Sequence, residues 1–291
     1  MHQSLTAFFL SSETSVPNMK KLLYFAYSII LAASAVSCGS TDRSIDIDTV
    51  TVSTAADTLD SLSAKDTVAV SDSLFSVMRI HFKDSVYDSS EDATSSFTLT
   101  VDVPSGTDSL VTAINLWIAR QLNSRDTLSF TEEELSQLSD AYLRQDGLKP
   151  GSRLCDSICM VYNTDRYVSY ERKGYEYTGG AHALPYYYGV TFDKATGENI
   201  SEDLFKTTDG LGRLLKKHLL AQYAKNPKID FEDLLFENMR KDFTLPVYPA
   251  WMVADGVRFA YSTYEIAPYS VGIPTCTIPY SDIKKYLKRK D

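Results

Sequence analysis

The stretch Phe97-Thr98-Leu99-Thr100-Val101-Asp102-Val103 alternates apolar and polar residues without a break. Successive side chains of a strand point to opposite faces of a sheet, so this alternation predicts a strand with one buried face. After a short connection, Asp108 begins a segment with apolar residues at helical spacing, which predicts an amphipathic helix. The residues of its apolar stripe are Leu110, Ile114, Trp117, Ile118 and Leu122. A strand followed directly by such a helix indicates a domain that mixes both kinds of element.

Further strands are indicated on both sides of this stretch. Alternating runs predict strands over residues 77–82, 154–162, 166–177, 186–192 and 275–278. Asp255-Gly256 lies between two apolar runs, which is a strong signal for a hairpin over residues 251–261. Hairpins of this kind, interleaved with a few helices, predict an α+β fold with mixed, mainly antiparallel sheet segments and packed helices.

Helix signals account for much of the remaining chain. Thr131 and Glu134 form a capping box that predicts a helix ending near Gly147. Apolar residues at helical spacing predict two more helices, over 211–224 and 231–236. Ser281 is expected to cap a short basic helix at the C-terminus.

The N-terminus has the pattern of an export signal. Lys20-Lys21 precede the apolar run 22–33, and the small residues Ala35-Val36-Ser37 come directly before Cys38. This order is typical of a secretory signal, and the run is shorter than the about 20 residues that span a membrane. The segment resembles a bacterial lipobox, which implies that Cys38 is diacylated, becomes the mature N-terminus and binds the membrane. An ordinary signal peptide with an incidental cysteine is the alternative.

These signals predict a protein of the cell envelope that faces outside the cytoplasm, in the periplasm or at the cell surface. Residues 39–73 are rich in Ser, Thr, Asp, Ala and Val, which favours a flexible tether over a short edge strand near Thr49. Such a coil would span roughly 30–35 Å. The expected divisions are a signal peptide over 1–37 (with Met19 as an alternative start), a tether over 38–73, an N-terminal portion over 74–184 and a C-terminal portion over 185–291.

Composition and missing motifs limit the function. The net charge of −9 argues against a nucleic-acid partner, because phosphate neutralisation needs clustered Lys and Arg. Only four His are present, without a dense cluster of metal-ligating residues, so neither a metal nor another cofactor is expected. The sequence contains no Gly-x-Ser-x-Gly, no phosphate-binding glycine loop and no His-Glu-x-x-His. Chemistry alone therefore indicates no reaction.

Three cysteines remain once the signal and Cys38 are set aside. They are Cys155, Cys159 and Cys276. Cys155 and Cys159 share one face of an expected strand but lie too far apart along it for a bridge. Buried, unpaired thiols are the favoured interpretation, and a disulfide of undetermined connectivity is the alternative.

Tyrosine is unusually frequent: the chain has 19, most of them in residues 162–188 and 248–286. Tyrosine combines a broad apolar face with a polar tip and is favoured at recognition surfaces, although sheets also favour it. His182 and Glu265 could form an acid–base couple, or could instead bond to the backbone. The candidate binding residues are Tyr177, His182, Tyr187, Tyr264, Glu265 and Tyr269.

Two groups of motifs carry a family resemblance. The first is Tyr175-Glu176-Tyr177-Thr178-Gly179-Gly180-Ala181-His182 with residues 192–197 and 203–205, and the second is 255–261 followed by 264–272. In this order they resemble the extracytoplasmic domain of RsiV-type anti-sigma factors, which PdaC-type peptidoglycan deacetylases share in their N-terminal part. The resemblance covers residues 74–287. It implies an α+β fold divided near the Gly-Gly-Ala-His motif.

The resemblance also implies a binding function. In the anti-sigma members this domain binds lysozyme directly. Here only 18 residues precede Met19 and the chain stops at Asp291, so we expect the binding module without a sigma-binding segment or a deacetylase domain. The leading hypothesis is therefore a lipid-anchored binding protein for a lysozyme-like protein or a peptidoglycan fragment. The alternative is a cell-wall-modifying enzyme or enzyme accessory that uses His182 and Glu265.

Overall fold

The computed structural model describes residues 41–51, 76–123, 126–224 and 230–288. All of them belong to one compact unit, residues 39–291. The expected signal peptide and Cys38 lie outside the described residues.

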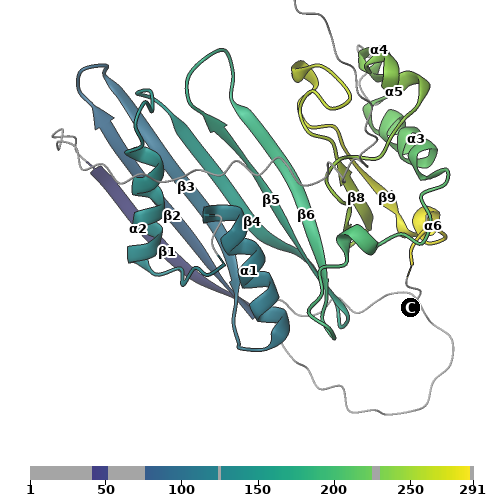
Figure 1. Cartoon of the computed structure of the whole chain (residues 1–291), viewed down its shortest axis with the longest axis horizontal. Helices are drawn as coiled ribbons and strands as arrows, with labels where there is room; N and C mark the ends of the chain where they lie inside the picture. The colour runs from purple at the N-terminus through teal and green to yellow at the C-terminus, as the bar shows by residue number, and fades with distance from the viewer. Residues whose placement is uncertain (1–40, 52–75, 124–125, 225–229, 289–291) are drawn as a thin grey trace, which may run out of the picture. The chain divides into compact units, whose positions relative to one another are not determined.

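The larger sheet has six strands in chain order (Figure 1). They are β1 (Thr41–Thr51), β2 (Ser76–Asp88), β3 (Ala93–Pro104), β4 (Arg153–Asn163), β5 (Tyr167–Tyr177) and β6 (Leu184–Asp193). Neighbouring strands are antiparallel except β3 and β4, which pair in parallel. A parallel pair needs a long crossover, and α1 (Ser109–Asn123) and α2 (Glu132–Leu143) lie within it. The predicted α+β fold is confirmed.

Both crossover helices cover one face of this sheet. Phe97, Leu99 and Val101 of β3 are buried there, as their alternation predicted. Ile114 and Ile118 of α1 pack in the same hydrophobic core. Asp108 accepts a hydrogen bond from the N–H of Val111 and so caps α1. These contacts fix the helices on the sheet because each apolar stripe meets an apolar sheet face.

Strand β1 corrects the expectation of a tether. Residues 41–51, expected to be flexible, pair with β2 along the whole strand. Arg43 donates to the buried carboxylate of Asp84, and Ile45 packs against the core under the helices. Among the side chains of this strand that the structure describes, Ile45 is the one that packs against that core, so few apolar residues are needed, and the tether prediction is wrong for this segment.

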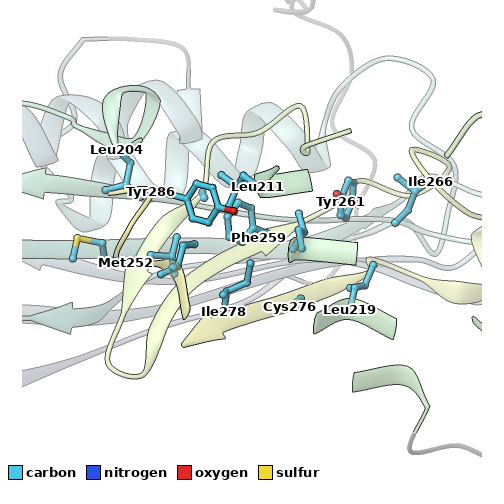
Figure 2. Close-up of a cluster of buried hydrophobic side chains, with 14 of the residues drawn as sticks. Leu204, Leu211, Leu219, Met252, Phe259, Tyr261, Ile266, Cys276, Ile278 and Tyr286 are labelled. Atoms are coloured by element: carbon cyan, nitrogen blue, oxygen red, sulfur yellow. The ribbon is translucent and has the colours of Figure 1, made fainter. Parts of the chain in front are cut away.

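The second sheet has three antiparallel strands, β7 (Trp251–Val253), β8 (Gly256–Ala260) and β9 (Thr275–Pro279). Short helices accompany it: α3 (Leu211–Tyr223), α4 (Phe231–Leu234), α5 (Glu237–Lys241), α6 (Tyr280–Ile283), and the 3-10 turns η1 (Ser201–Asp203) and η2 (Tyr269–Val271). Figure 2 shows the buried side chains between them, among them Leu211, Leu219, Phe259 and Ile278. This is a hydrophobic core separate from the one under α1 and α2.

A buried polar contact joins the two sheets. Glu171 of β5, 6% exposed, accepts hydrogen bonds from Trp251 Nε1 at 2.9 Å and from the Arg258 guanidinium at 2.6 Å. Nearby, the N–H of Met252 donates to Thr191 Oγ1 at 2.9 Å. The Trp251 indole reaches this position because Gly189 of β6 has no side chain.

Element boundaries differ slightly from those expected. Helix α2 ends at Leu143 rather than near Gly147, and α6 begins directly after Pro279 rather than at a Ser281 cap. The hairpin loop is Ala254-Asp255, because Gly256 is already paired with Val253. The expected division at 184/185 falls inside β6, directly after its first residue, Leu184, and β6 is hydrogen-bonded to β5 in the same sheet.

Two glycines shape the β5–β6 loop. Gly179 and Gly180 have φ values of +95° and +105°, which side chains rarely tolerate. A Cβ on Gly179 would also approach the Lys149 side chain to 2.7 Å, whereas a Cβ on Gly180 would meet no atom within 4 Å. Gly180 is therefore required for its positive φ and not for a close approach to a neighbouring residue.

The space at Gly189 gives a first prediction. A Cβ there would lie 2.5 Å from the Trp251 ring, so Gly189→Ala should lower the free energy of unfolding by about 1–3 kcal/mol, the usual cost of overpacking. Urea denaturation measures this. The double variant Gly189→Ala/Trp251→Phe should be less destabilised than the sum of the single changes, because the smaller ring frees space. Strict additivity would contradict the contact.

Backbone strain alone should act at Gly180. Gly180→Val should destabilise the protein by about 1–3 kcal/mol, since valine must adopt a rarely populated φ. Thr178→Val in the same loop is the matched control, because Thr178 has no positive φ, and should change the melting temperature little. Equal melting temperatures for Gly180→Val and wild type would show that the loop relaxes without cost.

Candidate functional site

Three of the predicted binding residues meet at one place. The rings of His182 and Tyr269 stack with centroids 3.6 Å apart, and those of Tyr264 and Tyr269 lie 5.8 Å apart. The Tyr264 hydroxyl is 3.5 Å from His182 Nε2. Tyr264 is 54% exposed. We call His182, Tyr264 and Tyr269 the aromatic surface.

Loops of both sheets build the aromatic surface. His182 lies in the β5–β6 loop, and Tyr264 and Tyr269 lie between β8 and β9. The Tyr269 hydroxyl donates to the carbonyl of Ala183 at 2.7 Å and so holds the two loops together. Tyr264 has a φ of +64°, an uncommon value for a residue with a side chain. Such strain persists where the surroundings impose it, and it is often found at functional sites.

Glu265 has a different role from the one that an acid–base couple requires. One carboxylate oxygen accepts from the N–H of Val247 at 2.8 Å, and the other accepts from the N–H of Ser262 at 2.7 Å. Within the described residues no hydrogen bond links Glu265 to His182. The carboxylate therefore fixes the loops beside the aromatic surface.

Exposed apolar residues border the aromatic surface, and sequence reasoning missed them. Leu184 is 58% exposed and Val247 is 81% exposed. Tyr248 stacks on Tyr188 of β6 with ring centroids 4.7 Å apart. The sequence pattern that could have indicated them is Pro246-Val247-Tyr248-Pro249. It places two apolar residues between prolines in a loop, and binding residues are often found in loops.

A buried ion pair under α1 holds Tyr188, the residue on which Tyr248 stacks. Arg172 of β5 binds the Asp156 carboxylate and donates to Tyr188 and to the carbonyl of Gln121. The Tyr188 hydroxyl in turn donates to Gln121 Oε1 at 2.9 Å. Arg172 thus satisfies a carbonyl in the last turn of α1, where a positive charge is favourable, and it fixes the ring on which Tyr248 stacks.

Two predicted site residues do not join the aromatic surface. The Tyr177 hydroxyl donates to the carbonyl of Gly180 at 3.2 Å within its own loop. Tyr187 packs edge-on against Trp251 and accepts from Arg258 at 2.9 Å, so it belongs to the contact between the sheets. Burial, and then the Glu171 charge, raise the pKa of the Tyr187 hydroxyl above its ordinary value.

The cysteines are all unpaired in the described residues. Cys276 is buried as expected, and burial raises the pKa of its thiol to about 12. Cys155 and Cys159 are only half-buried, and burial raises the pKa of both thiols. All three thiols are therefore held in the protonated, unreactive form near neutral pH.

Among residues 41–51, 76–123, 126–224 and 230–288, no group of three or more His, Cys, Asp or Glu is arranged to hold a metal ion. In the same part of the chain, no helix is long and apolar enough to cross a membrane. The site offers an aromatic and aliphatic surface with a few polar groups at its edge.

A comparison with protein families matches residues 202–281 to the family "Protein of unknown function (DUF3298)". This segment contains the whole three-stranded sheet together with Tyr264 and Tyr269. No match to a curated protein was found.

Two crystal structures of DUF3298 proteins are similar to this chain. One, from Bacteroides fragilis, has a TM-score of 0.60 and 18% identity, and the match covers 72% of this chain and 92% of the other. The other, from Pseudomonas aeruginosa, has a TM-score of 0.55 and 18% identity, with coverages of 74% and 94%. At this identity the likeness shows the fold alone: the mixed α+β architecture is that of DUF3298 proteins of known structure.

Proposed function

We propose that the protein is a lipid-anchored binding protein of the cell envelope, which recognises its partner through the aromatic surface. The observation that carries this proposal is the exposed, strained Tyr264 beside the stacked rings of His182 and Tyr269. Side chains held in one conformation lose little entropy when a partner binds. Tyrosine also provides a large contact area with a polar tip, which is typical of recognition surfaces.

The surroundings favour a protein as the partner. Leu184 and Val247 add exposed aliphatic area beside the rings, and exposed apolar patches mark interaction sites. The chain as a whole carries a net charge of −9, which attracts a basic protein. A lysozyme-like protein, the partner that the RsiV-type resemblance implies, has this character. A peptidoglycan fragment is the other ligand that the same resemblance implies.

The geometry gives less support to an enzyme. An acid–base couple needs both groups to face the substrate within hydrogen-bond reach of the proton that is transferred, rather than to serve as fixed parts of the loop structure. Both oxygens of Glu265 already accept backbone N–H groups. His182 is held in the ring stack with Tyr269.

The anchor is tested by Cys38→Ser. Without the thiol no lipid can be attached, so the variant should move from the membrane fraction to the soluble fraction. Cys155→Ser is the control and should stay with the membrane. A Cys38→Ser protein that still sediments with membranes after its apolar segment has been cleaved would refute lipid attachment.

The binding surface is tested by Tyr264→Ala with lysozyme and purified muropeptides as ligands. Truncation of an interface anchor costs about 2 kcal/mol, so binding to the ligand that wild type captures should weaken roughly thirtyfold. Isothermal titration calorimetry measures this.

Tyr87→Ala is the matched control for this experiment. Tyr87 is also an exposed tyrosine, but it lies on β2, four strands away from β6 in the large sheet, so binding should be unchanged. Both variants should melt close to wild type. Equal affinity of Tyr264→Ala and wild type would place the site elsewhere, and capture of muropeptides but not lysozyme would reassign the partner to a glycan.

A further inference from the structure

The sheet register places the start of β1 and the aromatic surface at the same end of the large sheet. Thr41 pairs with Val86, near the β2–β3 turn. Farther along the sheet, Arg153 at the start of β4 pairs with Tyr177, the last residue of β5. The β5–β6 loop with His182 therefore leaves the sheet at the end where β1 begins. We call this the Thr41 end; in Figure 1 the β2–β3 turn and the β5–β6 loop share it.

Exposed apolar side chains are concentrated in this half of the sheet and in the loops beside it. Among the described residues, every exposed large hydrophobic side chain except Ile47 lies there. They are Tyr87, Tyr175, Leu184, Val247, Tyr248 and Tyr264. Exposed apolar side chains would be spread over both ends of the sheet if the whole surface faced solvent. Their concentration at one end indicates a surface that contacts a partner or a membrane.

The distance to the expected lipid anchor is short. Cys38 and Thr41 are three residues apart, which is at most about 11 Å of extended chain. The long tether that the sequence predicted would have held the domain clear of the membrane. Because β1 begins at Thr41 instead, an acylated Cys38 keeps this end of the sheet at the lipid surface.

We propose that the Thr41 end docks on the interfacial region of the bilayer, with Leu184, Tyr264 and their apolar neighbours in contact with lipid. This rests on the proposed function for its lipid anchor, and it adds regulation to the same site: a partner must compete with the membrane for the aromatic surface. Tyrosine is enriched at membrane interfaces because its ring is apolar and its hydroxyl stays hydrated. Local apolar contact adds to acyl chains in holding a protein on lipid.

The docking contact is apolar rather than electrostatic. The β2–β3 turn at the same end carries Asp88, Glu91 and Asp92, which would be repelled by anionic headgroups. Docking should therefore occur on zwitterionic vesicles and persist at high salt, where charge-driven binding is screened.

The test places a tryptophan at each end of the sheet in the full-length, membrane-purified protein. Leu184→Trp and Tyr264→Trp report the Thr41 end. Ala195→Trp, in the exposed turn after β6, reports the opposite end. Each variant is reconstituted into phosphatidylcholine vesicles with and without brominated lipid, and the fluorescence of wild type, with Trp117 and Trp251, is subtracted.

The expected result is strong bromolipid quenching at positions 184 and 264, unchanged at high salt, with little at 195. Equal quenching at both ends, or none at either of the two Thr41-end positions, would overturn the proposal. Vesicle flotation separates this from failure of the anchor. Wild type that floats but shows no quenching refutes docking alone, whereas wild type that does not float refutes the anchor and with it the docking.

Discussion

The buried carboxylate of Glu171 joins the two sheets of this protein by accepting hydrogen bonds across the contact between them. Burying a charge is costly unless it is paired and hydrogen-bonded. Trp251 and Arg258, both from the three-stranded sheet, supply these bonds. Glu171 belongs to the six-stranded sheet and its donors belong to the three-stranded sheet. Its hydrogen bonds can therefore form only when the two sheets are docked in this arrangement. Loss of the Arg258 guanidinium would leave this buried charge uncompensated.

The aromatic surface depends on this docked arrangement of the two sheets. His182 comes from a loop of one sheet, and Tyr264 and Tyr269 come from a loop of the other. The ring stack and the bond from Tyr269 to Ala183 form only if both loops arrive at the same place. Glu265 then fixes the neighbouring loop at Val247. The site is therefore a product of tertiary structure, built from short loops on rigid strands.

The sequence predicted most strands because their alternation is local information. Phe97–Val103 could be assigned from its pattern alone, since one face had to be buried. Strand β1 could not, because its residues are mostly polar and its stability comes from pairing with β2. The same limit applies to the site. Composition pointed to His182, Tyr264 and Tyr269, but whether Tyr187 faces a ligand or Arg258 is decided by residues distant in the chain.

The parallel pairing of β3 with β4 has a consequence for folding kinetics. Strands β2–β3 and β4–β5–β6 are joined by short connections and can form early, as local contacts do. The pairing of β3 with β4 requires the chain to close a loop of residues 105–152. This closure costs conformational entropy before any hydrogen bond between the two strands is gained. We expect the slow step of folding to be the docking of these two halves. Until α1 and α2 pack on the sheet and β3 pairs with β4, the facing edges of these two strands stay unpaired. The rate of this step therefore sets how long a folding chain exposes edges that could pair with another chain.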